Sequence, residues 1–362
     1  MSISLKIAAQ SELNVAVSPL AELGAALHVL DSPGHHRELA DWAATAGERM
    51  SARLRTDVAD LAPLWRAFRC RIFYPRRTPR PASGFDQELL DLEAVPADLF
   101  AAYCAHAIVG GGPFSAVREI SKDHESQRLF LSHSRARGSH GLALAQEMLR
   151  DIEGFRTHLI GVFDAFYRQV FEPEWQWLLP GLADEAWRAR RLFRERGAVE
   201  LLSELNPTAK WPSPSLMVLD KIGDSYLDVS HEPLTVIPSA LGAPHLILKD
   251  ELPSGAVLHY PMPAKGAPAE PADSIENLQR QLLALSDPIR LRLCRDLARD
   301  MRSTRHLADR WDLPESVVSR HLKALKKAGL VRVERQGSFV LYRLDIERVE
   351  RLGTALMNLI LV

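Results

Sequence analysis

The side chains whose chemistry is easiest to assign lie in residues 314–325, which have the sequence PESVVSRHLKAL. Apolar residues there recur at helical spacing, and polar side chains fill the positions between them. Arginine can donate two hydrogen bonds to guanine and serine can bond to any base edge, so the polar face suits the major groove of DNA. A solvated amphipathic helix without a partner fits this segment equally well, and the flanking elements must decide between the two.

The outward residues of this helix are small, polar or basic, and we predict that they contact DNA. They are Glu315, Ser316, Val317, Ser319, Arg320, His321 and Lys323. Val318, Leu322 and Leu325 share the opposite face and are predicted to pack inward. Pro314 suits the first turn of a helix because it has no N–H group to leave unpaired.

A second, shorter helix must hold this one in place. Residues 303–311 carry an apolar face with Leu307 and Trp311, and Ser303 or Thr304 can cap their first turn. Helix, tight turn and second helix form a helix-turn-helix, the motif that places one helix in a DNA groove. The contacts predicted just before this turn are Arg302, Ser303 and Thr304.

Residues 331–344 predict a β-hairpin that completes a winged helix. Apolar and charged residues alternate from Val331 to Glu334, and Gln336-Gly337 supplies a tight turn. A basic hairpin would reach phosphates or the minor groove, and such contacts position a protein without specifying sequence. The predicted wing contacts are Arg332, Arg335, Gln336, Ser338 and Tyr342. This context favours DNA binding over a merely solvated helix.

Positive charge is concentrated in the same part of the chain. Residues 274–344 contain 15 lysines and arginines and 8 aspartates and glutamates, a net charge of +7, although the whole chain carries −1. The rest of the chain therefore carries −8. Such asymmetry is typical of a DNA-binding domain joined to a domain that does not touch DNA.

Apolar stripes flank the helix-turn-helix on both sides. Residues 278–285 place leucines on one helical face, and Asp287-Pro288 opens the next helix as N-cap and first residue. A last helix, capped by Asp345, repeats apolar residues at heptad-like intervals. We predict a dimer interface, with packing inside the chain's own core as the alternative. Its residues are Leu278, Leu282, Val349, Leu352, Leu356 and Leu359.

Residues 285–293 (LSDPIRLRL) and 318–325 (VSRHLKAL), with 328–331 (AGLV), resemble the ArsR/SmtB family of repressors over about residues 274–362. The resemblance implies a homodimer that binds an inverted-repeat operator in double-stranded DNA, with two recognition helices one DNA turn apart. It also implies a transcriptional regulator that acts as a repressor.

More loosely, residues 17–22 (VSPLAE), 234–239 (LTVIPS) and 259–261 (HYP) resemble a subgroup of these regulators that has a large N-terminal domain of unknown function. The resemblance brings no catalytic or ligand residues with it.

Two features depart from the family. Pro314 stands where members often have a capping serine or threonine. Metal-sensing members carry cysteines on the helix before the turn, or histidine and aspartate ligands on the last helix. Here residues 303–313 have no cysteine, residues 345–362 have neither histidine nor cysteine, and Cys294 is the lone thiol of this part. We therefore predict no metal at those family sites.

The fold class predicted for the whole chain is mainly α with a smaller β part. Residues 1–209 form a helical sensor domain, and residues 210–262 form a β-rich extension, a small antiparallel sheet packed on it. A linker follows at 263–273, within a stretch (261–271) that carries four prolines. The winged helix-turn-helix occupies residues 274–362.

We predict that the acidic N-terminal part senses a small organic effector in a pocket near Trp175, Trp177 and Trp187. An effector that prefers one dimer geometry would change half-site spacing and thereby operator affinity. Aromatic residues of this kind can equally be core.

The histidines invite a metal hypothesis, and the densest groups include His35-His36, His124, His133 and His140. No HExxH motif or paired Cys/His spacing accompanies them, so we predict solvated or hydrogen-bonded histidines, with no metal and no cofactor. No nucleophile motif indicates an enzyme. Two other functions stay open: a metabolite-binding protein or enzyme with a DNA-binding tail, and a protein–protein adaptor that uses the winged helix.

Composition gives no support for a membrane, secreted or disulfide-rich protein. The chain is 46% apolar and 25% charged, and no apolar run approaches the roughly 18–20 residues of a membrane span. Its N-terminus lacks the layout of a signal peptide, and its three cysteines lie far apart. These features predict a cytoplasmic protein without a membrane partner.

Overall fold

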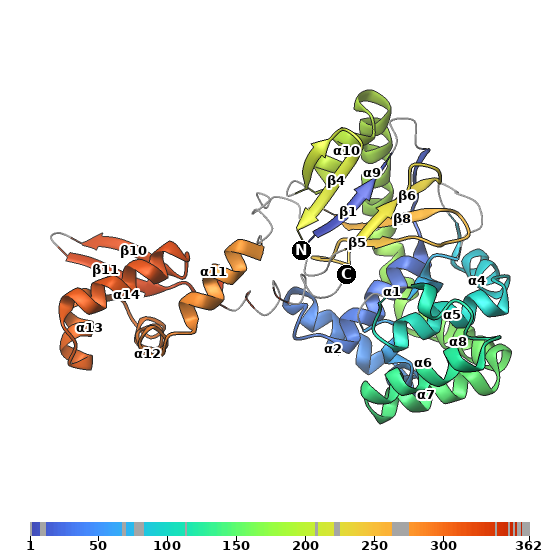
Figure 1. The fold of residues 1–362 in the computed structure, drawn as a ribbon, viewed down its shortest axis with the longest axis horizontal. Coiled ribbons are helices and arrows are strands. Elements are labelled where there is room, and N and C mark those ends of the chain that lie inside the picture. Colours follow the sequence, from blue (N-terminus) through green and yellow to red (C-terminus); the bar gives the residue numbers. More distant parts are fainter. Residues whose placement is uncertain are drawn as a thin grey trace. The chain divides into compact units, whose positions relative to one another are not determined.

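The computed structural model describes residues 2–7, 12–66, 70–75, 83–112, 114–206, 209–220, 225–262, 275–336, 339–346, 348, 349, 352 and 356. The chain divides into two compact units, which we call the N-terminal unit (mainly residues 2–268) and the C-terminal unit (mainly residues 269–360) (Figure 1). None of the described helices combines the length and hydropathy that crossing a bilayer requires. The predicted linker lies outside the described residues.

The helices of the N-terminal unit are α1 (Pro19–Asp31), α2 (Ala40–Arg49), α3 (Ala52–Asp60), α4 (Phe85–Glu93), α5 (Ala97–Ile108), α6 (His124–Ala136), α7 (Ser139–Arg150), α8 (Ile152–Phe166), α9 (Glu172–Arg196) and α10 (Ala198–Leu205). Shorter helical turns are η1 (Arg37–Leu39), η2 (Ala62–Leu64), η3 (Arg71–Phe73), η4 (Phe114–Ala116) and the π-helical η5 (Tyr167–Phe171). Its strands are β1 (Ser2–Lys6), β2 (Leu13–Val15), β3 (Lys210–Ser213), β4 (Leu216–Asp220), β5 (Ser225–Asp228), β6 (Leu234–Ser239), β7 (Ile247–Lys249) and β8 (Ala256–Pro261).

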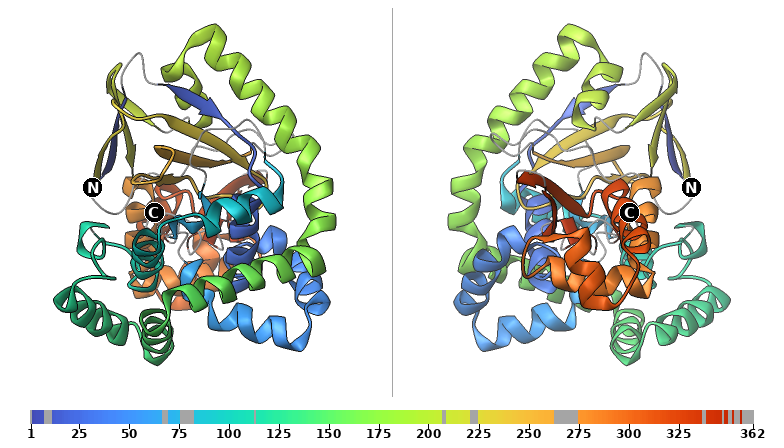
Figure 2. Two further views of the ribbon diagram at one scale, coloured as in Figure 1. Left: turned by 90° about the vertical axis from the view of Figure 1, so that its right-hand side faces the viewer. Right: turned by 90° about the vertical axis from the view of Figure 1, so that its left-hand side faces the viewer.

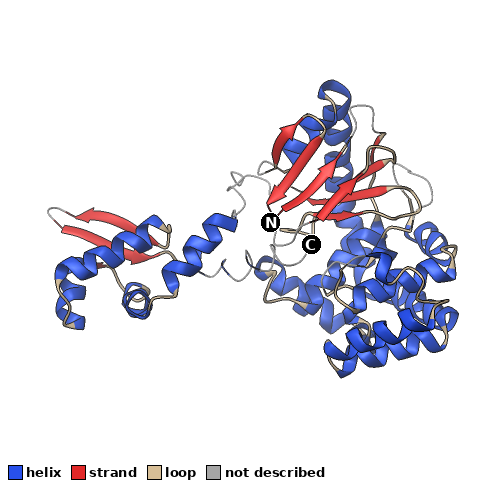
Figure 3. Ribbon diagram, viewed as in Figure 1, coloured by secondary structure: helices blue, strands red, loops and turns tan. Residues whose placement is uncertain are grey.

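Mainly α with a smaller β part is confirmed as the fold class (Figure 3). In the N-terminal unit the strands gather on one side and α1–α8 on the other, while the long helix α9 runs from the helical part past the sheets and contacts β2 and β6 (Figure 2). Large apolar side chains such as Trp65, Phe100 and Phe163 are fully buried between these elements.

The prediction of a small antiparallel sheet is wrong, because the sheets of the N-terminal unit include parallel strand pairs. The described strands of the N-terminal unit form two mixed sheets, ordered β3-β4-β1-β5 and β2-β6-β8-β7. The pairs β1·β5, β2·β6 and β6·β8 are parallel, with Leu5 opposite Leu227 and Val15 opposite Val236. The short turns between the predicted strands of residues 210–262 suggested hairpins. Strands β1 and β2 come instead from residues 2–6 and 13–15, which lie in the segment expected to be helical. Their partners lie in the β-rich segment, so the parts expected at 1–209 and 210–262 share both sheets.

A buried polar network begins at the N-terminus of α1. The Oγ atom of Ser18 accepts a hydrogen bond from the Ala21 N–H at 3.1 Å and so caps the helix. The same hydroxyl donates to Glu88 on α4 at 2.8 Å, and the Glu88 carboxylate also accepts the Leu20 N–H at 2.9 Å. Both side chains are buried, so their bonds fix α1 against α4 in a medium where an unpaired polar group is costly.

Glu22, one turn further along α1, holds the segment after β6. Its Oε1 atom accepts hydrogen bonds from the N–H groups of Ala240 and Leu241 at 2.8 and 2.7 Å, and its side chain is only 1% exposed. Ser239 accepts the Gly242 N–H at 2.8 Å within the same segment. Glu22, from one of the segments that carried the looser family resemblance, therefore ties α1 to the connection between β6 and β7.

The C-terminal unit contains α11 (Ile275–Leu285), α12 (Pro288–Leu297), β9 (Arg302–Ser303), α13 (Thr304–Trp311), α14 (Glu315–Lys327), β10 (Val331–Gln336) and β11 (Phe339–Leu344). Its strands form one sheet in the order β10-β11-β9, so the hairpin is antiparallel and β9 adds its third strand. The predicted opening of α12 is confirmed, because Asp287 accepts the N–H groups of Ile289 and Arg290 at 2.8 and 3.1 Å. This order of elements is that of a winged helix-turn-helix.

Candidate nucleic-acid interface

The turn between α13 and α14 sets the direction of the second helix. Ser303 caps α13 by accepting the His306 N–H at 3.2 Å, as predicted. The helix ends where Asp312 adopts a left-handed conformation with φ 48°. Pro314 then precedes α14 and offers no side-chain cap, so the departure from the family at this position is present in the structure.

The inward face of α14 is confirmed. Val318, Leu322 and Leu325 are each 0% exposed and pack in one core with Leu307 of α13 and Leu330 before β10. This core fixes the rotation of α14 about its axis. The remaining face must point away from the unit, because opposite sides of a helix cannot share one core.

The outward face of α14 carries polar and basic groups. Glu315, Ser316, Arg320 and Lys323 are exposed, and the two smaller predicted residues, Val317 and Ser319, are half-buried. Neither Arg320 nor Lys323 has a carboxylate within ion-pair distance among the described residues. Both cations are therefore available to an anionic partner.

His321 does not belong to this outward face. Its side chain is 12% exposed, and its Nδ1 atom lies 3.8 Å from the carboxylate of Asp287, the cap of α12. Helical rotation explains the difference, since His321 follows Arg320 by one position and turns toward α12. The DNA contact predicted for His321 stays a prediction, and this position makes its ring less accessible than the Arg320 side chain.

The hairpin presents basic side chains of two kinds. Arg335 and Arg343 are exposed, whereas Arg332 forms a two-point ion pair with Asp345, with Nε–Oδ2 and Nη2–Oδ1 distances of 2.8 and 3.2 Å. Burial works to raise the pKa of Asp345, but its contacts with Arg332 and Arg348 outweigh burial and lower that pKa. Asp345 also accepts the Arg348 N–H at 3.4 Å, as expected of a helix cap.

The other residues predicted to contact DNA from the wing and the turn are less accessible to a partner or lie outside the described residues. Tyr342 is half-buried against the core of the unit. Arg302 lies 3.2 Å from Asp300, and Thr304 is half-buried. Ser338 and the side chain of Gln336 lie outside the described residues.

The predicted dimer residues separate into core and surface. Leu278 is 2% exposed and Leu352 8% exposed, and both belong to the core of the unit, with Val349 and Leu356 packed against it. Leu282 is 42% exposed, and its neighbour Leu283, which the helical spacing did not single out, is 60% exposed. Leu359 lies outside the described residues. Among the predicted dimer residues whose side chains the structure describes, Leu282 on α11 is thus the exposed one.

The tryptophans do not form the predicted effector pocket. Trp175 is packed in the core of the N-terminal unit, whereas Trp177 and Trp187 are 75% and 56% exposed, with the guanidinium of Arg191 over the Trp187 ring. The three lie on one helix, α9, and their helical positions turn them to different sides.

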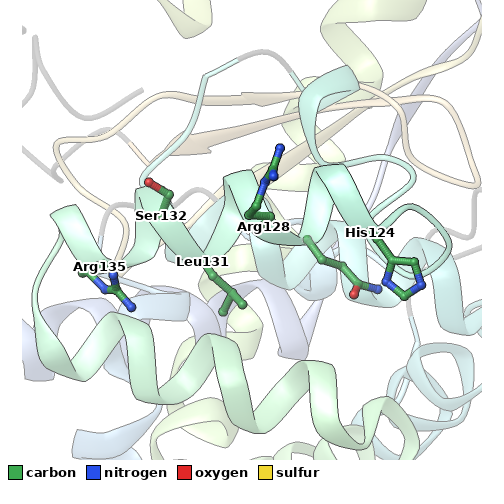
Figure 4. Close-up of a pocket in the computed structure, with 6 residues that line it drawn as sticks. His124, Arg128, Leu131, Ser132 and Arg135 are labelled. Carbon is green, nitrogen blue, oxygen red and sulfur yellow. The ribbon is translucent and has the colours of Figure 1, made fainter.

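A shallow hollow of about 420 Å³ lies instead beside α6 (Figure 4). Its lining consists of His124, Gln127, Arg128, Leu131, Ser132 and Arg135, all from one exposed helix. A hollow so formed does not enclose a small molecule as a buried effector site would.

The residues able to hold a metal were not evident from their spacing. His35 and His36 lie beside His28 and His245, whereas His124, His133 and His140 are exposed on α6 and α7. In the C-terminal unit, burial raises the pKa of the Cys294 thiol to about 11, which disfavours the thiolate that metals bind.

Comparison with known proteins matches both units. Residues 1–266 match a family of unknown function, DUF5937, and residues 285–334 match a helix-turn-helix domain. Two curated proteins named HTH-type transcriptional repressor SmtB, from Mycobacterium tuberculosis strains CDC 1551 / Oshkosh and H37Rv, are 42% identical over 78 residues, or 21% of this chain. The chain spans 58% of the length of these repressors.

Two solved structures are similar to the same region. An ArsR-like transcriptional regulator from Rhodococcus sp. RHA1 is 28% identical and covers 22% of this chain and 76% of its own, with a TM-score of 0.22. The homodimeric winged helix-turn-helix DNA-binding domain of a Mycobacterium bovis protein is 28% identical. The match covers 24% of this chain and 84% of that domain, with a TM-score of 0.21.

Proposed function

Because this chain belongs to the DUF5937 family, whose function is unknown, and ends in an ArsR/SmtB-type winged helix-turn-helix, we propose that it represses transcription as a homodimer on an inverted-repeat operator. The observation that carries the proposal is the outward face of α14, where Ser316, Arg320 and Lys323 stand opposite a fully buried apolar face. Such a helix can enter the major groove without disturbing its own core.

The contacts divide into two kinds. Arg320 is the candidate for bidentate pairing with guanine, with Glu315, Ser316, Val317, Ser319 and Lys323 along the same groove. Arg335, exposed on β10, is the candidate for a phosphate contact, which adds affinity without sequence preference. Arg332 would have to exchange its ion pair with Asp345 for a phosphate, so it contributes less.

The exposed leucines of α11 support a dimer. Leu282 and Leu283 would leave apolar surface in water in a single chain, and burial against a second copy removes that surface. The proposed DNA-binding and dimerisation part is residues 274–362, and the N-terminal unit, which carries the negative charge, receives the signal. A catalytic activity forms no part of this proposal.

The test measures binding of the full-length protein to fluorescent DNA that contains the inverted repeat of its own promoter. We expect tight binding whose affinity falls by about 10³–10⁵ between 50 and 200 mM salt if about 6–10 phosphates are contacted. A scrambled repeat should bind far more weakly. Equal affinity for both DNAs, or no dependence on salt, would contradict the proposal.

The dimer is tested by sedimentation of Leu282→Glu. A charge at this exposed position should disfavour the apolar contact and shift the protein toward monomer. Leu291→Glu is the matched control, because Leu291 is 51% exposed on a different helix, α12. An unchanged dimer in Leu282→Glu would move the interface elsewhere.

A further inference from the structure

Four histidines of the N-terminal unit converge from separate segments of the chain. His28 lies on α1, His35 and His36 lie in the turn that follows it, and His245 lies between β6 and β7. Each offers one ring nitrogen, and these four nitrogens lie within 4.8 Å of one another. The Nε2 atoms of His35 and His245 are 3.1 Å apart.

Backbone carbonyls orient two of the rings. The Nδ1 atom of His28 lies 3.1 Å from the Trp65 carbonyl, and that of His36 lies 3.0 Å from the Ala243 carbonyl. A carbonyl can only accept, so Nδ1 carries the hydrogen in both rings and Nε2 carries the lone pair. Metal-ligating histidines typically have this arrangement, in which one ring nitrogen donates to a carbonyl and the other binds the ion.

The environment keeps the rings of His28 and His36 neutral. His28, His36 and His245 are 0%, 4% and 3% exposed, and His35 is half-buried. Burial, together with the neighbouring histidines, lowers the pKa of His28 to about 3 and that of His36 to about 4. Neutral imidazole is the form that binds a metal ion.

Ring packing alone does not account for the cluster. Edge-to-face contacts join the rings, with centroids 4.9 Å apart for His28 and His36 and 4.7 Å apart for His35 and His36. Among the described residues, the buried Nε2 atom of His36 still has no hydrogen-bond partner. A cation at the centre of the cluster would satisfy this nitrogen.

We propose that His28, His35, His36 and His245 bind one divalent first-row transition-metal ion of the class that prefers imidazole, from Co²⁺ to Zn²⁺. Tetrahedral Zn²⁺ with Zn–N bonds of about 2.0–2.1 Å places its ligand nitrogens about 3.4 Å apart. The four nitrogens, all within 4.8 Å of one another, would have to draw closer together to reach that spacing. Mg²⁺ and Ca²⁺ prefer oxygen ligands and do not suit the site.

The buried polar network gives the site its rigidity. Glu22 holds the N–H groups of Ala240 and Leu241, just before His245, against the helix that carries His28. The ligands from α1 and from the β6–β7 connection are thereby placed before any ion arrives. Metal binding here does not depend on the proposed DNA binding, because the ligands all lie in the N-terminal unit.

The test uses tag-free, full-length protein that has been stripped with a chelator. Calorimetric titration with Zn²⁺ should give one ion per chain, and Mg²⁺ in excess should not compete. Titration with Co²⁺ should give the strong visible absorption of a tetrahedral ion without a thiolate charge-transfer band. Absence of saturable binding, or a thiolate band that places the ion on a cysteine, would overturn the proposal.

Variants then locate the ion. His35→Ala removes the half-buried ligand. Loss of a residue that only hydrogen-bonds to a metal ligand weakens metal binding by about 10–100-fold, and loss of a ligand itself should weaken Zn²⁺ binding more than that. His133→Ala, at an exposed histidine of α6, is the matched control and should bind like the wild type. Circular dichroism checks that His35→Ala is folded. Equal affinities of His35→Ala and the wild type would place the ion elsewhere and refute the site.

Discussion

The two units of this protein assemble their functional groups in opposite ways. In the C-terminal unit, the candidate base-reading groups lie on one helix of 13 residues and share its outward face. In the N-terminal unit, the histidine cluster joins His35 to His245, which are 210 residues apart in sequence. A surface on a single helix follows from helical periodicity, whereas a cluster of this kind exists only once distant segments have packed together.

The difference has an energetic consequence. Outward residues of α14 take no part in the core, so their substitution should change binding and leave stability nearly intact. Residues that build the histidine cluster are buried among polar partners, so their substitution should change stability and binding together. Five substitutions test this contrast.

The largest expected effect is that of Glu22→Leu in the N-terminal unit. The N–H groups of Ala240 and Leu241 would lose their acceptor, and each buried donor left unpaired costs about 1–3 kcal/mol. We expect a loss of about 2–6 kcal/mol in the free energy of unfolding, measured by urea denaturation. Glu22→Gln keeps the Oε1 acceptor and should lose much less. A stable Glu22→Leu would show that the network does not hold this connection.

Leu322→Ala probes the core that orients α14. Truncation of a fully buried leucine costs about 2–5 kcal/mol, so hydrogen exchange of the α14 amides should accelerate accordingly. Leu291→Ala, at a half-exposed leucine of α12, should stay within about 0.5 kcal/mol of the wild type. Similar exchange rates in both variants would contradict the assigned orientation of α14.

Arg320→Ala should change sequence preference without changing stability. Loss of a bidentate contact to guanine costs about 1–3 kcal/mol at one base pair, measured with operators that carry single base-pair substitutions. Thermal unfolding of the variant should match the wild type. Unaltered sequence preference would mean that α14 enters the groove in another orientation.

Asp287→Ala removes the cap of α12 and should cost about 0.5–2 kcal/mol. Hydrogen bonding by the Arg290 N–H lowers the pKa of Asp287 despite the opposing effect of burial. Its stabilising contribution is therefore present above the ordinary value of about 3.9 and is lost as pH falls through the lower folded pKa. Acid unfolding of wild type and variant should converge below that pKa, and a constant difference would contradict the assignment.

Arg335→Ala should have the smallest effect and the least specific one. Removal of one phosphate contact reduces the slope of log K against log salt by about 0.9, equally for all DNA sequences. Arg295→Ala on α12 is the control, because Arg295 is exposed but not on the hairpin or on α14. A change in sequence preference for Arg335→Ala would place this side chain at the bases.

Much of the C-terminal unit could be predicted from local signals. The caps at Asp287 and Ser303, the inward residues of α14 and the hairpin after Leu330 are all confirmed, and so is the resemblance to ArsR/SmtB regulators with an N-terminal domain of unknown function. Each of these features depends on residues within a few positions of one another. The position of His321 could not be predicted in this way, because its ring lies beside Asp287, the cap of another helix.

For the N-terminal unit, the sequence predicted the fold class, mainly α with a smaller β part, but not how the strands pair. Helix periodicity and Gly/Pro punctuation indicated helices and short strands, but the parallel pairing of β1 with β5 and of β2 with β6 depends on contacts across more than 200 residues. The tryptophans near 175–187 suggested a pocket because their positions in sequence are close. On a helix such neighbours point in different directions, and the structure accordingly separates Trp175 from Trp177.

The sequence by itself determined the winged helix, since periodicity, capping residues and charge are local properties that survive without knowledge of the rest of the fold. Only the tertiary structure decided which side chains of the N-terminal unit meet. His35-His36 carried no metal-binding spacing, and Glu22 carried no sign of its partners. Burial of α1 against the connection after β6 brought His35 and His36 to His28 and His245, and Glu22 to its partners. Apolar contacts drive this packing, and the polar groups on the packed elements come together as a result.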